Sequence, residues 1–264
     1  MATDNNNNTG VKPTLLAFHG SGSNATVHTV QRARLNRVIS SEFQIESMEA
    51  PFPCQAGPGV LPFFEGCGPF KRWLRTPVSV GQIKNGTGSS AMEPQVQDLV
   101  RSTVERINAS GGKVVGIIGF SQGTKVLAGL LKGSELRAAL AAKGEDVSDI
   151  AWCDFQFGVV VCGSFPPPLF PQDVIAKVEK AAGLSEAEKK ELLERKISTP
   201  TFHVVGTQDE YEWAGDALIG GYFEVAEGKS EVRKWDMGHY YPTRPEENEE
   251  IGKWMVDVMK GGAP

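Results

Sequence analysis

Short apolar runs alternate with amphipathic stretches along most of the chain. Six runs have the length and the β-branched or apolar content of strands: Thr14–Phe18, Phe43–Met48, Val114–Gly119, Phe157–Cys162, Thr201–Val205 and Glu231–Trp235. Segments between them place apolar residues three or four positions apart, as amphipathic helices do. These helical segments are Val27–Ile39, Val96–Ile107, Thr124–Leu140 and Glu246–Met259. The alternation predicts βα units and a mostly parallel sheet of about six strands, with helices on both faces.

Two long segments interrupt this alternation. Residues 50–88 are rich in proline and glycine but also carry aromatic residues, which argue against disorder. Residues 164–200 begin with a proline-rich stretch and continue into two predicted helices, Gln172–Ala182 and Ser185–Arg195, the second with a capping-box pattern. Long irregular segments in compact domains usually carry function, and we expect residues 164–200 to form a lid above one end of the sheet.

Length, composition and charge narrow the class of protein. A chain of 264 residues with 40% hydrophobic and 22% charged residues can bury an ordinary core. We expect residues 12–264 to form one α/β domain after a disordered polar N-terminus, residues 1–11. The net charge is −5 and no more than two Lys or Arg residues are adjacent, so no nucleic-acid-binding stripe is expected.

Cysteine spacing and the longest apolar runs exclude further classes. The four cysteines show no C-x-x-C spacing and lie far from the histidines in sequence, so no disulfide framework and no metal site are expected. No apolar run approaches the roughly 18 residues of a membrane helix, and the N-terminus lacks a signal-peptide pattern. We therefore expect a cytoplasmic protein that does not span a membrane.

The candidate chemistry begins at Gly119-Phe-Ser-Gln-Gly123, which matches the G-x-S-x-G pattern. The motif follows an apolar run and precedes a helical segment, which is the strand–turn–helix context of a nucleophile elbow. Glycines flank Ser121 because a side chain at either position would collide in so tight a turn. Ser121 is the predicted nucleophile. The Gln122 N–H, at the start of the helix, is the predicted first donor to an oxyanion.

A serine nucleophile needs a general base and an orienting acid. In folds that contain a nucleophile elbow, the order along the chain is Ser, acid, His. Only His203 and His239 follow Ser121. His203 lies in mid-strand, where we expect a hydrogen-bonded core histidine. His239 lies in a loop after the last strand, from which it can reach the edge of the sheet, so it is the predicted base.

Asp209 is the predicted acid because it lies four residues past the end of a predicted strand, with one strand between it and His239. Glu210, Asp216 and Asp236 compete for this role. Asp216 is expected on a helix, and Asp236 is only three residues from His239, so either could be a surface charge.

The second oxyanion donor usually comes from the loop after an early strand. His19-Gly-Ser-Gly22 ends the first predicted strand and forms a turn of small residues. We predict that the Ser21 backbone N–H is this donor, with Gly22 as the alternative. His19 is expected to shape the loop rather than to transfer protons.

Further motifs accompany these residues: Ala50-Pro-Phe-Pro53, Phe64-Glu-Gly66, Gly68-Pro-Phe-Lys-Arg-Trp73, Gly206-x-x-Asp209 and Gly238-His239 with Pro242. Together they resemble the fungal serine hydrolase family over roughly residues 12–258. The resemblance implies a compact α/β-hydrolase with esterase or thioesterase activity. It also implies similarity to enzymes of fungal polyketide gene clusters, which release acyl chains from the carrier domain of a synthase.

The predicted reaction is hydrolysis of a small-molecule ester or thioester through an acyl-Ser121 intermediate, without a cofactor. Water activated by His239 would release the acid. We expect an apolar acyl pocket lined by aromatic residues of the 50–73 segment and by the proline-rich residues 166–171. The aromatic residues are Phe63, Phe64, Phe70 and Trp73.

Three other functions are compatible with the same residues. An acyltransferase or condensing enzyme would resolve the acyl-enzyme with an alcohol or a carbon nucleophile instead of water. A ligand receptor on a hydrolase fold would turn over slowly or not at all. A structural or partner-binding protein with vestigial residues is disfavoured, because every catalytic role has a candidate residue.

Overall fold

The computed structural model describes residues 11–78, 81–82, 85 and 88–261, so the predicted disordered segment 1–11 lies outside the described residues except for Val11. A six-stranded sheet has the order β2-β1-β5-β6-β7-β8, and its neighbouring strands are parallel. The strands are β1 (Thr14–Phe18), β2 (Gln44–Met48), β5 (Val114–Phe120), β6 (Phe157–Val161), β7 (Thr201–Gly206) and β8 (Ser230–Trp235). The predicted mostly parallel sheet is confirmed.

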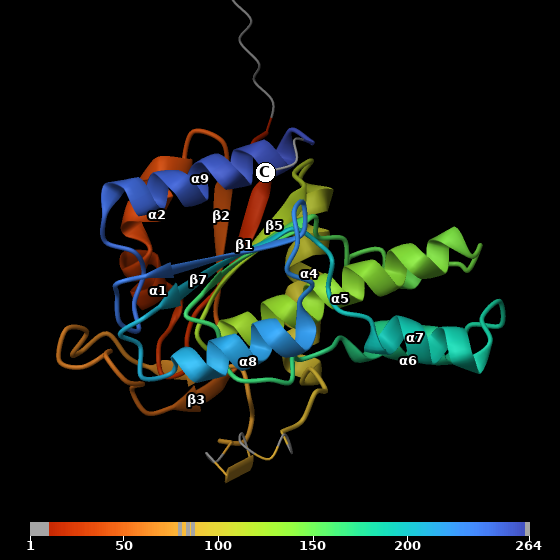
Figure 1. Cartoon of the computed structure of the whole chain (residues 1–264), viewed down its shortest axis with the longest axis horizontal. Helices are drawn as coiled ribbons and strands as arrows, with labels where there is room; N and C mark the ends of the chain where they lie inside the picture. The colour runs from red at the N-terminus through yellow and green to blue at the C-terminus, as the bar shows by residue number, and fades with distance from the viewer. Residues whose placement is uncertain (1–10, 79–80, 83–84, 86–87, 262–264) are drawn as a thin grey trace, which may run out of the picture.

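Helices cover both faces of this sheet (Figure 1). One face packs against α2 (Ala33–Ile39) and α9 (Pro245–Met259), and α1 (Ala25–Gln31) lies beside β2. The opposite face packs against α4 (Pro94–Ala109), α5 (Gly123–Ala142) and α8 (Glu212–Tyr222). A 3₁₀ turn spans Ser148–Ile150. Within the described part of the chain, none of the helices combines the length and the apolar content needed to cross a membrane.

The four central strands, β1, β5, β6 and β7, are buried on both sides because helices cover both faces, whereas the edge strands β2 and β8 are only partly buried. In β1, Leu16 and Phe18 belong to the cluster under α4 and α5, whereas Leu15 and Ala17 belong to the cluster under α2 and α9. This is the reason for the continuous apolar runs in the sequence, which lack the polar alternation of a half-exposed strand. The loops at the carboxyl ends of the strands are then the natural place for a site in an open α/β sheet.

The segment predicted as one helix over Val27–Ile39 is two helices, α1 and α2, so that prediction was wrong. Arg32 separates them with φ of −96° and ψ of 15°. Its side chain is buried, and its guanidinium donates to Asn36 and Ser47. The hydrophobic spacing continues through the break, and therefore gave no sign of it.

The 50–88 segment contains a small antiparallel sheet that the sequence analysis did not predict. Its strands are β3 (Phe52–Cys54) and β4 (Phe70–Arg72), in which Phe52 pairs with Arg72. Strands of three residues are too short to show an alternating pattern. Both lie below the carboxyl end of the main sheet, where β3 is labelled in Figure 1.

Residues 164–200 contain the two predicted helices, α6 (Gln172–Lys180) and α7 (Glu186–Glu194). The capping box between Ser185 and Glu188 is present. The helix pair packs against α5 and projects from one side of the molecule (Figure 1). Lys125 of α5 holds the start of this segment, because its buried Nζ donates to the carbonyl oxygens of Phe165, at 2.9 Å, and Pro167.

Lys125 should make stability depend on pH. Burial lowers its pKa from 10.5 to about 7 in the folded protein. Between these values the unfolded chain binds the extra proton, so the free energy of unfolding rises with pH, by about 2 kcal/mol from pH 7 to pH 9 for this group. The free energies of unfolding of the wild type and of Lys125→Met can be measured in urea at each pH. The value for the wild type should rise relative to that of the variant from pH 7 to pH 9. A difference that does not change with pH would contradict the expectation.

Candidate active site

The turn after β5 places Ser121 at the carboxyl edge of the sheet. Its φ of +47° lies in the left-handed region that residues with a side chain seldom adopt. A Cβ on Gly123 would lie 2.3 Å from the Phe18 carbonyl oxygen, and one on Gly119 would lie 3.0 Å from the backbone of α5. The predicted strand–turn–helix geometry is present; the backbone of β1 requires glycine at position 123, and the backbone of α5 leaves little room for a side chain at position 119.

His239 and Asp209 lie in the loops after β8 and β7 and are hydrogen-bonded, with 2.7 Å between Nδ1 and Oδ2. The other carboxylate oxygen of Asp209 accepts the Tyr211 N–H at 2.8 Å. Burial opposes ionisation of the Asp209 carboxyl, but the hydrogen bonds from His239 and Tyr211 outweigh it and lower the pKa of the carboxyl. An ionised Asp209 holds the ring proton on Nδ1, which leaves Nε2 to act as an acceptor.

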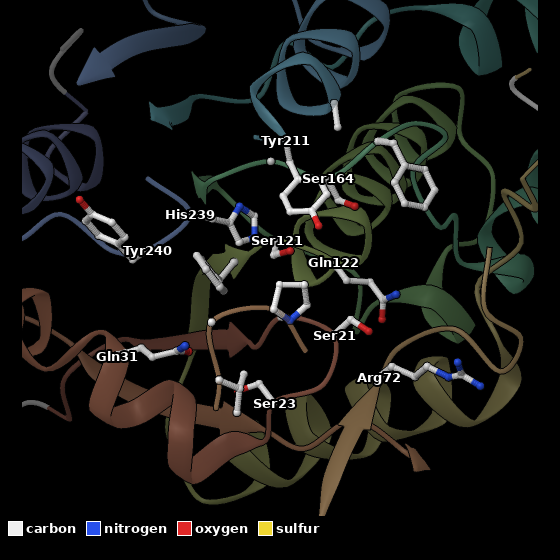
Figure 2. A pocket seen from close by; sticks show the side chains of 18 of the residues that line it. Ser21, Ser23, Gln31, Arg72, Ser121, Gln122, Ser164, Tyr211, His239 and Tyr240 are labelled. Atoms are coloured by element: carbon white, nitrogen blue, oxygen red, sulfur yellow. The ribbon is translucent and has the colours of Figure 1, made fainter. Parts of the chain in front are cut away.

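The Ser121 side chain lies beside the His239 ring, and both line the same cavity (Figure 2). Among the described residues, the His239 ring makes one hydrogen bond, to Asp209. The hydrogen bond between a catalytic base and its nucleophile often tightens only when substrate binds. The rings of Phe120 and Tyr211 lie 5.1 and 5.2 Å from the His239 ring, centroid to centroid. Their packing restricts rotation of the imidazole.

Cys162 also belongs to this group, although the sequence analysis did not single it out. It directly follows β6 with φ of +49°, and its Sγ lies 3.7 and 3.6 Å from the carbonyl oxygens of Gly238 and Tyr240, on either side of His239. Burial raises the pKa of this thiol well above its usual range, so it is protonated and can donate to these carbonyls. Its position at the end of a predicted strand, beside the motif strand, was the available signal.

Cys162, Asp209 and His239 also offer three potential metal-ligating atoms within 4.8 Å of one another. A cysteine binds metal as a thiolate, and metal affinity requires deprotonated ligands. The Cys162 thiol is protonated and the other two side chains bond to each other. This donor set fits a hydrogen-bond network rather than a metal site.

The loop after β1 lies directly against Ser121. A Cβ on Gly20 would lie 3.2 Å from the Cβ of Ser121. Within the described residues, the backbone N–H groups of Ser21 and Gln122 have no acceptor. Both predicted oxyanion donors are thus backbone N–H groups without an acceptor among the described residues, and Ser21 and Gln122 line the cavity together with Ser121 (Figure 2).

His19 and Trp73 hold this loop from behind. The His19 ring donates to the Gly20 carbonyl at 2.7 Å and accepts the Ala50 N–H at 3.1 Å. Burial lowers the pKa of His19, which favours its neutral form. The Trp73 indole N–H donates to the His19 carbonyl oxygen, and its backbone N–H donates to Gln122 Oε1, both at 2.7 Å. His19 therefore has a structural position, away from the proton-transfer path.

A second close approach joins the same loop to the cavity wall. Gly22 has φ of +71°, and a Cβ on it would lie 1.9 Å from the Gly57 nitrogen. In the other direction, a Cβ on Gly57 would lie 2.1 Å from the Ser21 carbonyl oxygen. The Gly57 N–H donates to the Gly22 carbonyl at 2.9 Å. The two segments are in backbone contact, with no room for a side chain between them.

A cavity of about 570 Å³ opens in front of Ser121 (Figure 2). Much of its lining is apolar: Val60, Phe63, Phe64, Leu74, Val78, Phe120, Phe165 and Trp213. The residues Ser23 and Gln31 also line it, and Ser23 Oγ and Gln31 Oε1 are buried without a hydrogen-bond partner among the described residues. No pattern in the sequence points to these two polar residues.

Two of the four predicted pocket residues, Phe63 and Phe64, line the cavity, but Phe70 and Trp73 do not. Neighbouring side chains of an extended segment point in opposite directions. Arg72 and Leu74 face the cavity, and Trp73 is therefore directed into the core, where it is fully buried. The proline-rich residues 166–171 are also absent from the described lining, which includes only Ser164 and Phe165 from the predicted lid.

The remaining candidates lie elsewhere or have other partners. Asp216 is on α8 and pairs with Lys234 at 2.9 Å. His203 is buried in β7, with its ring centroid 4.5 Å from that of Phe223. It is a core residue, but its ring nitrogens have no hydrogen-bond partner among the described residues, so the expected hydrogen bonding was wrong. Burial lowers the pKa of His203 to about 3, and the uncharged ring packs as an apolar group.

Comparisons with known proteins identify the family of the chain. The profile of the family described as Serine hydrolase (FSH1) matches residues 8–251. The chain is 29% identical over 234 residues to "Esterase citA" of Monascus ruber, covering 88% of this chain and 86% of that protein. It is 32% identical over 247 residues to an esterase of Didymella fabae, covering 87% and 84%.

A solved structure shows the shared fold. The crystal structure of Arabidopsis thaliana SOBER1 aligns with a TM-score of 0.51 and 20% identity, covering 94% of this chain and 100% of that chain. With the parallel sheet and the Ser121 turn, this identifies an α/β-hydrolase. The chain belongs to the serine hydrolase (FSH1) family and is an ester-hydrolysing enzyme.

Proposed function

We propose that the enzyme hydrolyses a small-molecule ester or thioester through an acyl-Ser121 intermediate. The observation that carries this proposal is the 2.7 Å bond between His239 and the buried Asp209, on the cavity wall that also holds Ser121. His239 Nε2 takes the hydroxyl proton as Oγ attacks the acyl carbon. Asp209 keeps the ring in the required tautomer and stabilises the imidazolium that forms.

Attack converts the acyl carbonyl oxygen into an oxyanion, which the N–H groups of Gln122 and Ser21 stabilise. The support for this role is that both groups lack an acceptor among the described residues and that Ser21 and Gln122 line the same cavity as Ser121. His239 then returns its proton to the leaving alcohol or thiol. In the second half of the reaction it activates water, which releases the acid and regenerates Ser121.

The apolar lining favours a hydrophobic acyl group. Phe63 is 86% exposed and Phe64 is half-buried, so these rings extend the apolar surface from the cavity to the outside. This arrangement suits an acyl chain that enters from solvent. We propose an acyl chain of polyketide type, delivered as a thioester on an acyl carrier domain, as the substrate class to test first.

Removal of the nucleophile should abolish turnover. We expect Ser121→Ala to lower kcat for 4-nitrophenyl butyrate by about 10³-fold or more. The variant should also lose labelling by a fluorophosphonate probe, because the probe bonds to the activated serine. Ser164→Ala, which also lines the cavity, is the matched control and should keep the label. Labelling that persists in Ser121→Ala would contradict the assignment.

Asp209→Asn should reduce kcat by about 10²- to 10⁴-fold, because an amide favours the wrong imidazole tautomer. The Asp209→Asn variant should remain folded, which a cooperative thermal unfolding transition would show. Asp216→Asn removes an aspartate that pairs only at the surface and should change kcat by less than about twofold. Equal effects of the two substitutions would rule out Asp209 as the orienting acid.

Removal of the aromatic rings of Phe63 and Phe64 should raise KM most for esters with long acyl chains. For the double variant Phe63→Ala/Phe64→Ala we expect KM to rise about 5- to 20-fold for 4-nitrophenyl decanoate but to change little for the acetate, since the acetyl group does not reach these rings. Phe70→Ala removes a neighbouring ring outside the described lining and serves as the control. Similar changes in KM for both esters would argue against an acyl pocket here.

A further inference from the structure

One cationic side chain lies in the otherwise mostly apolar cavity. Among the described residues that line the cavity, Arg72 is the only Arg, Lys, Asp or Glu. Figure 2 shows it on the same side of the cavity as Ser21 and Gln122. A guanidinium is always protonated in proteins. The catalytic rim therefore has a fixed positive charge that the reaction described above does not use.

The backbone of Arg72 is held on both sides by the oxyanion loop and the Ser121 turn. On one side, the Lys71 N–H donates to the Ser23 carbonyl oxygen at 2.8 Å. On the other side, the Trp73 N–H donates to Gln122 Oε1 at 2.7 Å. Arg72 therefore has a fixed position relative to the reacting centre, as a binding group needs.

The Arg72 guanidinium has few partners. Its Nη2 donates to the Arg75 carbonyl oxygen at 2.9 Å, and its Nε is buried without a hydrogen-bond partner among the described residues. Two basic residues close to Arg72 in the sequence are paired: Lys71 Nζ lies 3.3 Å from Glu49, and Arg75 Nε lies 3.5 Å from Glu93. No described carboxylate lies within 4.0 Å of Arg72. Of these three cations, Arg72 is the one that lines the cavity and the one without an anionic partner among the described residues.

We propose that Arg72 binds an anionic group of the substrate, a carboxylate or a phosphate. This inference rests on the proposed function, because it assigns a specificity residue to the same ester- or thioester-cleaving site. The planar guanidinium can give two parallel hydrogen bonds to either group. The apolar walls strengthen that attraction by excluding water. The anion can belong to the acyl part or to the leaving alcohol or thiol.

Two matched pairs of substrates distinguish these sources. For the acyl part, the 4-nitrophenyl monoester of glutaric acid is compared with 4-nitrophenyl valerate, which has the same chain length without the carboxylate. For the leaving group, butyryl phosphopantetheine is compared with butyryl pantetheine. Each pair differs by one anionic group, so the ratio of kcat/KM within a pair isolates its contribution.

The variants are Arg72→Gln, Arg72→Lys and the control Arg75→Gln, which removes an equal charge outside the described lining. We expect Arg72→Gln to lower kcat/KM for the anionic member of at least one pair by about 10- to 100-fold, mainly through KM. The neutral members should change by less than about threefold. Arg72→Lys should restore part of the preference, and Arg75→Gln should leave it unchanged.

Equal losses on the anionic and neutral members of both pairs would overturn the proposal and give Arg72 a purely structural role. The wild type provides an independent measurement if Arg72→Gln does not fold. Its preference for the anionic member should fall as ionic strength rises, and a preference that is absent at every salt concentration would also overturn the proposal. Failure of the proposed function would look different, since Ser121→Ala would then still hydrolyse the neutral esters.

Discussion

The active site depends on one close approach, that of helix α5 to the carboxyl end of β1. Gly123 opens the helix so near the Phe18 carbonyl oxygen that no other residue fits there. With the helix in this place, the chain leaving β5 must reverse within a few residues, and Ser121 adopts a left-handed backbone conformation. Strain of this kind persists only where the surroundings fix it. Here they are a buried strand on one side and a long buried helix on the other.

The other groups lie at the same edge of the sheet as Ser121, because its parallel strands all end there. Asp209, Cys162 and His239 follow β7, β6 and β8, so residues distant in sequence lie within hydrogen-bonding reach. Two rings restrict the imidazole, and a protonated thiol contacts the carbonyls on either side of it. The precision of the site therefore comes from packing and secondary hydrogen bonds as much as from the bond between His239 and Asp209.

The sequence predicted the sheet well because its four central strands, β1, β5, β6 and β7, are buried throughout and appear as largely apolar runs. It placed Ser121, Asp209 and His239 after the ends of three strands, and these strands end at the same edge of the parallel sheet. It failed where local pattern carries no information. The hydrophobic spacing continues through Arg32, and three-residue strands such as β3 show no alternation. Trp73 illustrates the same limit. The aromatic content of its segment suggested a pocket residue, but the direction of its side chain depends on β4, which directly precedes it and directs Trp73 into the core.

The backbone contact between Gly22 and Gly57 has a consequence for how such an enzyme can diversify. The segment that follows Gly57 supplies Val60, Phe63 and Phe64 to the cavity, while the segment with Gly22 carries a proposed oxyanion donor. Because the two segments are in contact through main-chain atoms, a change in the backbone after Gly57 would displace the loop that carries the proposed oxyanion donor. New substrate preferences should therefore arise by substitution of side chains on the same backbone. Insertions or deletions near Gly22 and Gly57 are disfavoured.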